Sequence, residues 1–265
     1  MKFYEAKKLK PQNGAMDSVA QLDIMKGMKH ILNDEIGSMK ATSILLKAFL
    51  WDPIFNKPGW KPELFDLPNK EVRQTYEKKF KDLTPFICLF NRLKKNHRIE
   101  QVQIIMAKLS VPASVPYLAK TFKPNPDIKD IDEFRQDMTD YLGKGTGFEW
   151  TEEVSADKKE VIYKFTRCAY IEILRAYGME YAASMVCYCD HIIFDNCTPE
   201  LYFKRDHCKG VGDGYCDHHY KIRKQTDAEN DDKRYGDTKK APYDAMAIIK
   251  KWEKNYKEND GQFKW

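Results

Sequence analysis

The spacing of hydrophobic residues along this chain changes at a group of three glycines, Gly143, Gly145 and Gly147. Before them, apolar residues recur every three or four positions, as on one face of a helix. After them, apolar and polar residues alternate over residues 161–166, which is the period of a strand. The two patterns together predict an α+β fold, with helices packed on a small antiparallel sheet and a mostly helical N-terminal half.

The same patterns predict where the elements lie. The expected helices cover residues 19–32, 44–51, 72–83, 86–93, 102–109, 134–141, 170–177, 180–193 and 243–256. The expected strands cover residues 148–154, 161–166, 201–207 and 215–223. Two prolines are expected to interrupt helices: Pro53 stops the second one, and Pro85 kinks or ends the third.

These elements divide the chain into three regions of one expected globular unit. Residues 1–147 form a helical region packed on the core, and residues 148–224 form the α+β core that bears the sequence motifs. Residues 225–265 form a polar loop and a C-terminal helix. A chain of 265 residues is long enough for one large domain.

The charge and the hydrophobic content of the chain limit the kinds of molecule that it is expected to bind. The 45 basic and 40 acidic side chains are mixed along the chain, and the net charge of +5 is small. No basic block with interleaved aromatic residues suggests nucleic acid binding. No run approaches the roughly 20 apolar residues of a membrane span, and no secretion signal is recognised. We therefore expect a cytoplasmic protein with a small-molecule substrate, and neither nucleic acid nor membrane as partner; homo-oligomerisation stays open.

Six of the seven cysteines lie in one segment of the chain. They are Cys168, Cys187, Cys189, Cys197, Cys208 and Cys216. An odd number of cysteines in a chain with no recognised export signal predicts reduced thiols. Reduced thiols gathered in one segment suggest that the chemistry of the protein lies there.

A glycine-rich turn over residues 209–214 predicts the register of the last two strands. The expected pairs are Leu201 with Ile222, Phe203 with Tyr220, Arg205 with His218, and His207 with Cys216. Because side chains alternate between faces, Arg205, Cys216 and His218 continue the apolar inward face at its turn end. A guanidinium and a thiol at the edge of a core favour a pocket. A slip of one residue would reverse this arrangement.

The expected helices and strands also predict the surroundings of two further cysteines, Cys187 and Cys168. On one expected helix, Cys187 shares a face with Asp190 and His191, which follow it by three and four residues, and Cys189 points elsewhere. Cys168 follows a strand directly, at the junction with the next helix. Such junctions often direct a side chain into a site.

Two kinds of chemistry fit these residues. In the first, a thiolate whose pKa is lowered by Arg205 or a histidine attacks an electrophilic carbon while a carboxylate moves protons. In the second, cysteines with Asp or His bind zinc. The chain has one C-x-C, at Cys187 and Cys189, and no C-x-x-C pair, so zinc is the weaker alternative and no cofactor is required.

Four short motifs resemble one known family. They are Phe165-Thr166-Arg167-Cys168, then Cys187-Tyr188-Cys189-Asp190 as C-x-x-D, then Arg205, then Gly212-Asp213-Gly214-Tyr215-Cys216-Asp217 as G-D-x-x-C-D. In order and spacing, over residues 148–220, the chain resembles the L-2-amino-thiazoline-4-carboxylic acid hydrolase family.

The resemblance implies hydrolysis of a small heterocycle at a C–N bond of an amidine carbon. A cysteine adds to this carbon, a carboxylate holds the cationic amidine, and Arg205 pairs with the carboxylate of the substrate. The candidate catalytic residues are Cys168, Cys187, Asp190 and Cys216, and the candidate substrate-binding residues are Arg205, Asp213, Asp217 and His218. The three cysteines are not ranked as the nucleophile.

The chain also departs from the family pattern. After Cys216 and Asp217 an aromatic residue is usual, and this chain has two histidines there; Cys189, Cys197 and Cys208 are extra cysteines. Two rival functions stay open. One is a small-molecule sensor with a structural zinc, resembling vinyl-reductase-type binding domains, and the other is an isomerase or cyclase of the same family.

Overall fold

The computed structural model describes residues 18–121, 128–143, 147–197 and 200–223. The polar loop and the helix expected within residues 225–265 lie outside these ranges. The division of the chain into three regions stays a prediction.

Helices form most of the described chain. The α-helices are α1 (Ser18–Ile36), α2 (Ser38–Leu46), α3 (Asp52–Phe55), α4 (Lys70–Leu93), α5 (Ile99–Thr121), α6 (Ile131–Tyr141), α7 (Ala169–Ala176) and α8 (Glu180–Cys197). A π-helix, η2 (Lys47–Trp51), joins α2 to α3, and η3 (Pro62–Leu64) and η4 (Lys209–Val211) are short 3-10 helices. No helix within the described ranges is long and apolar enough to cross a membrane.

The prolines interrupt these helices less than predicted. Pro85 lies inside α4, which continues to its predicted end, so the alternative that the helix ends at Pro85 is wrong. Pro53 stands in the first turn of α3, which follows η2 directly, so helical structure continues past residue 51 and the predicted stop is also wrong. α5 continues past residue 109 through Pro112, which packs against Gly27 of α1: an added Cβ there would lie 2.8 Å from the Pro112 Cβ.

One small antiparallel sheet completes the fold. Its spatial order is β1 (Phe148–Val154), β2 (Glu160–Cys168), β4 (Cys216–Ile222) and β3 (Leu201–Lys204). The predicted register of the last hairpin is confirmed for its first two pairs, Leu201 with Ile222 and Phe203 with Tyr220, whereas the ladder ends before the predicted pairs of Arg205 with His218 and His207 with Cys216. The sheet and the helices together confirm the α+β fold with its mostly helical N-terminal half.

The strand β3 ends at Lys204, three residues before the predicted end at residue 207. The carboxylate of Asp217 accepts the backbone N–H groups of Asp206 and His207, at 3.0 and 2.5 Å. These bonds take the place of part of the predicted ladder. Residues 205–207 are therefore held beside β4 by this side chain together with one backbone bond, from the N–H of Asp217 to the carbonyl oxygen of His207 at 3.3 Å.

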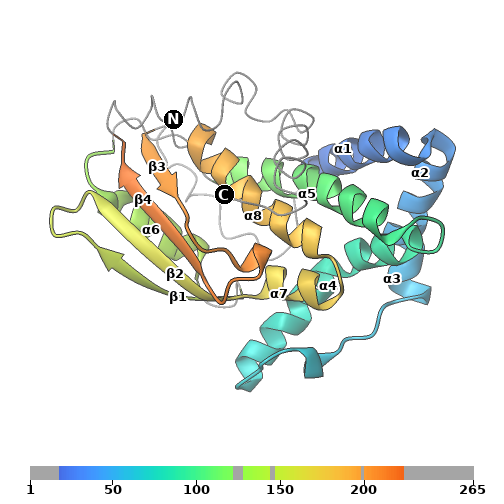
Figure 1. Ribbon diagram of the computed structural model, residues 1–265, viewed down its shortest axis with the longest axis horizontal. Helices are drawn as coiled ribbons and strands as arrows, with labels where there is room; N and C mark the ends of the chain where they lie inside the picture. Colours follow the sequence, from blue (N-terminus) through green and yellow to red (C-terminus); the bar gives the residue numbers. More distant parts are fainter. Residues whose placement is uncertain (1–17, 122–127, 144–146, 198–199, 224–265) are drawn as a thin grey trace.

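The helix α8 lies between the sheet and the N-terminal helices α1 and α5 (Figure 1). It packs against α5 on one side and against β3 and η4 on the other. Alternate residues of β2, namely Val161, Tyr163 and Phe165, are buried. The position of α8 brings its side chains to the segment that joins β3 and β4.

Candidate active site

Three buried cysteines meet where α8 contacts the segment between β3 and β4. Cys187 lies on α8, Cys208 precedes η4, and Cys216 begins β4. The three sulfurs hydrogen-bond with one another. We call these three residues the thiol cluster. Cys208, set aside above as an extra cysteine, is the residue that sequence reasoning misses; its place across the glycine-rich turn from Cys216 is the signal that could have found it.

A glycine lets this turn pack directly on α8. A Cβ at Gly210 would lie 2.7 Å from the Sγ of Cys187 and 2.9 Å from the carbonyl oxygen of Ala183, both too close for a real side chain. The backbone N–H of Lys209 donates to the Sγ of Cys216 at 3.2 Å, and that of Gly210 donates to Cys208. The close approach at Gly210 therefore brings the thiols of the turn to the thiol of the helix.

Two of the predicted substrate-binding carboxylates support the backbone around the thiol cluster. Asp213 is exposed, and its Oδ2 accepts the N–H of Cys208 at 2.7 Å. Asp217 accepts the N–H groups of residues 206 and 207, and its side chain is 23% exposed. Both carboxylates thus have a structural task in the turn, and contact with a substrate stays a prediction for them.

The guanidinium of Arg205 lies beside the thiol cluster and is almost fully buried, with 2% of the residue exposed. Its Nη1 donates to Oδ2 of Asp190 at 2.9 Å and lies 3.2 Å from Nε2 of His218. Its Nη2 donates to the carbonyl oxygen of Cys187 at 2.5 Å. The structure therefore brings these predicted site residues together, but the enclosed guanidinium gives no support to the prediction that Arg205 pairs with a substrate carboxylate.

The thiol cluster favours one negative charge, centred on Cys208. Hydrogen bonds from Cys187 and Cys216 hold the pKa of Cys208 well below its usual range, and Arg205 lowers it further against the effect of burial. The pKa of Cys187 is raised well above its usual value, first because its thiol donates to Cys208. The protons titrate as a property of the three groups together. A thiolate held in this way is the reactive form of cysteine.

Two titratable groups flank Arg205. Burial raises the pKa of Asp190 to about 6, and the positive charge of Arg205 opposes this rise. Burial is the main cause that holds the pKa of His218 well below its usual 6.5, and the positive charge of Arg205 is the second. The imidazole of His218 is therefore neutral near pH 7. Its Nδ1 lies 3.2 Å from the hydroxyl of Tyr220. The side chain of His191, predicted on the same helix face as Asp190, lies outside the described part.

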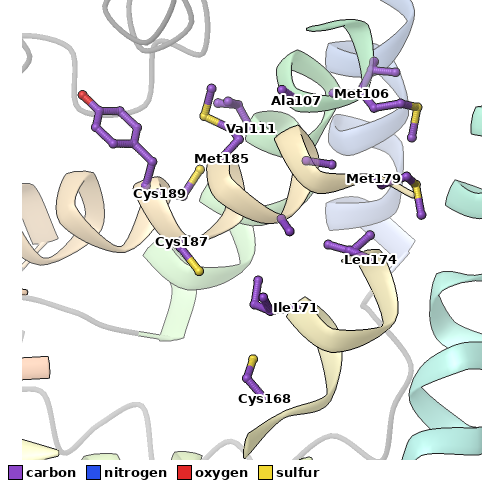
Figure 2. Packing of buried hydrophobic residues seen from close by; sticks show 14 of the residues in the cluster. Met106, Ala107, Val111, Cys168, Ile171, Leu174, Met179, Met185, Cys187 and Cys189 are labelled. Atoms are coloured by element: carbon purple, nitrogen blue, oxygen red, sulfur yellow. The ribbon is translucent and has the colours of Figure 1, made fainter. Parts of the chain in front are cut away.

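The other cysteines of the segment have different surroundings. Cys168 is the residue that precedes α7, and burial raises the pKa of its thiol. Cys168 and Cys187 both point toward Ile171 (Figure 2). Cys189 lies on a different side of α8 from Cys187, as predicted, and burial raises its pKa as well. Neither Cys168 nor Cys189 shares a side-chain hydrogen bond with the thiol cluster, so neither thiol is stabilised as a thiolate in that way.

A pocket of about 320 Å³ lies beside the thiol cluster, between residues 64–66, α7 and η4. Its charged lining residues are Asp66, Glu172, Arg175, Lys209 and Asp213. Lys209 joins the pocket to the cluster, because its backbone N–H donates to Cys216 while its Nζ pairs with Glu172 at 3.2 Å. Glu172 also accepts the N–H of Cys168 at 3.1 Å.

Zinc prefers thiolate ligands, and the thiol cluster supplies that ligand type. Over residues 18–121, 128–143, 147–197 and 200–223, however, no group of three or more His, Cys, Asp or Glu side chains is arranged to hold a metal ion. A zinc site at these cysteines stays an untested prediction.

Comparison with known families finds one whose model spans the thiol cluster and all the predicted site residues. The family model described as L-2-amino-thiazoline-4-carboxylic acid hydrolase matches residues 77–220. The chain belongs to this family. The match covers more than half of the 265 residues and extends the resemblance seen over residues 148–220 back into α4. No curated protein and no solved structure matches the chain.

Proposed function

We propose that this protein hydrolyses a small heterocycle of the 2-amino-thiazoline-carboxylate type at its amidine carbon, with a thiolate of the thiol cluster as nucleophile. The observation that carries the proposal is the set of three buried, hydrogen-bonded thiols beside Arg205. Two thiols donate to a third sulfur next to a cation, which favours one thiolate in a site with little water. Membership in a family described by the name of a hydrolase supports the same activity.

The reaction needs one nucleophile and one proton carrier. The thiolate adds to the carbon bonded to two nitrogens and a sulfur, and the π electrons of the C=N bond move to nitrogen, which takes a proton. The tetrahedral adduct collapses by releasing the exocyclic nitrogen as ammonia or by opening the ring. Water then attacks the same carbon and expels the cysteine sulfur as thiolate. Each turnover consumes one water and restores the thiol cluster.

Asp190 is the proton carrier in this proposal. With a pKa raised to about 6, it exchanges a proton readily near neutral pH, and 21% of its side chain is exposed to solvent. Arg205 contacts both Asp190 and the backbone of Cys187, so the carboxylate and the thiol cluster lie on two sides of one guanidinium. The guanidinium also stabilises negative charge on either the carboxylate of Asp190 or the thiol cluster.

Product analysis in heavy-oxygen water, with L-2-amino-thiazoline-4-carboxylate as substrate, tests the proposal. We expect one solvent oxygen in the product, with ammonia or a new primary amine showing which C–N bond breaks. Cys208→Ser should lower kcat by about 1000-fold or more, because the thiolate is lost. Cys189→Ser is the matched control, since Cys189 is equally buried on another side of α8, and it should retain wild-type kcat.

Other outcomes identify the rival functions. A product without solvent oxygen would indicate the isomerase or cyclase alternative. One zinc per chain, with Cys187 and Cys216 protected from alkylation, would indicate the sensor alternative and would refute the role of the cysteines as nucleophile.

A further inference from the structure

Among the residues that the structure describes, Arg175 is the cation of this pocket that forms no ion pair. Lys209 pairs with Glu172 at 3.2 Å, Asp66 pairs with Arg167 at 3.4 Å, and Asp213 accepts the N–H of Cys208 at 2.7 Å. Arg175 differs from them. Its Nη1 donates to the carbonyl oxygen of Gly210 at 3.3 Å, and no carboxylate of the described residues forms an ion pair with it.

The guanidinium of Arg175 lies against the glycine-rich turn. A Cβ added at Gly212 would lie 3.4 Å from its Nη2, so the side chain passes close to a backbone that has no side chain of its own there. Arg175 is only partly buried, and it lines the pocket. A planar guanidinium can present two parallel N–H donors to the two oxygens of a carboxylate.

The same turn links this guanidinium to the thiols. The carbonyl oxygen of Gly210 contacts Arg175, and the turn approaches α8 so closely that a Cβ added at Gly210 would lie 2.7 Å from the sulfur of Cys187. A carboxylate on Arg175 would thus lie beside the turn that also contacts the thiol cluster. In a 2-amino-thiazoline-4-carboxylate, the carbon that bears the carboxylate is two ring bonds from the amidine carbon, so the group that binds the carboxylate must lie near the nucleophile.

We propose that Arg175 binds the carboxylate of the substrate, in the pocket lined by residues 64–66, α7 and η4. This inference rests on the proposed function for the identity of the substrate, and it assigns to Arg175 the part predicted for Arg205. The volume of about 320 Å³ is at the small end of the range for ligand pockets and suits a single five-membered ring with its substituents. Glu172 and Asp213 in the same lining favour a ligand that also carries a cationic amidine.

Calorimetric binding of L-thiazolidine-4-carboxylate tests the inference without any turnover, because this ring acid has no amidine carbon to attack. We expect Arg175→Gln to weaken its binding by about 10- to 150-fold, the usual loss for a hydrogen-bonded charge. Arg73→Gln is the control, since it removes the same charge from an exposed position of α4, and it should bind like the wild type. Arg175→Lys, which keeps the charge but not the fork, should bind with intermediate affinity.

Activity on two substrates separates this inference from the proposed function. In Arg175→Gln, kcat/KM should fall for 2-amino-thiazoline-4-carboxylate and stay unchanged for 2-amino-thiazoline, which lacks the carboxylate; the second result also shows that the variant is folded. Hydrolysis of the acid with wild-type KM by Arg175→Gln would overturn the inference and leave the proposed function intact. Arg175-dependent binding of the ring acid without any hydrolysis would support the inference and contradict the proposed function. Equal binding by all the variants would overturn it as well.

Discussion

The substitution Gly210→Ala tests whether the close approach of the turn to α8 holds the thiol cluster together. The new methyl carbon would lie 2.7 Å from the Sγ of Cys187 and 2.9 Å from the carbonyl oxygen of Ala183, and ordinary contacts begin at 3.4 Å. The shortfalls are about 0.7 and 0.5 Å, the differences from 3.4 Å, and the Ala183 oxygen belongs to the backbone of α8 and yields little. Overpacking of this kind costs about 1–3 kcal/mol.

The same movement should change the chemistry of the turn. Cys208 is two residues before Gly210, so a displaced turn lengthens the hydrogen bonds that stabilise the Cys208 thiolate. The pKa of that thiol should therefore rise in the variant. The pH dependence of iodoacetamide alkylation measures this pKa, and urea unfolding measures the stability.

Gly214→Ala is the matched control for this experiment. An added Cβ at Gly214 meets nothing within 4 Å, and its backbone is not left-handed. We expect the control to unfold within about 0.5 kcal/mol of the wild type, and Gly210→Ala to lose about 1–3 kcal/mol. If the two variants show equal stability and equal alkylation profiles, the reasoning about the close packing is refuted.

Three further predictions concern the charges of the site. Arg205→Met should lower the free energy of unfolding by about 3–5 kcal/mol, because it leaves the largely enclosed carboxylate of Asp190, 21% exposed, without its partner. Urea unfolding measures this loss, and the double variant Arg205→Met with Asp190→Asn should recover part of it. Because the folded pKa of Asp190, about 6, is above its usual 3.8, ionisation destabilises the fold as the pH rises between these values. The stability of the wild type relative to Asp190→Asn should therefore fall from pH 4 to pH 6, and an unchanged difference across urea titrations would contradict this assignment. Asp213→Ala should cost about 1 kcal/mol by removing the acceptor for the Cys208 N–H, and Asp213→Asn, which keeps an acceptor oxygen, should retain most of that stability in thermal unfolding.

Local patterns predict much of this fold because each depends on near neighbours. Alternation gives β4 one inward face, and the short glycine-rich turn limits how β3 pairs with it, so the register of Phe203 with Tyr220 follows from the sequence. The early end of β3 does not follow, because it depends on the Asp217 side chain, which captures backbone N–H groups ten and eleven residues away. The helix through Pro85 is a similar case, since packing outweighs the lost hydrogen bond.

By itself, the sequence determined the order of helices and strands, the resemblance to the family, the shared helix face of Cys187 and Asp190, and the inward face of Arg205 and Cys216. Only the tertiary structure decided that Cys208 joins the thiol cluster, that Arg205 is enclosed, and that Arg175 faces a pocket. The physical reason is the range of the interactions. Periodicity acts within one element and chooses the face of a side chain, whereas burial and thiol contacts depend on how closely two distant segments pack. Here that closeness depends on the absence of a single Cβ at Gly210.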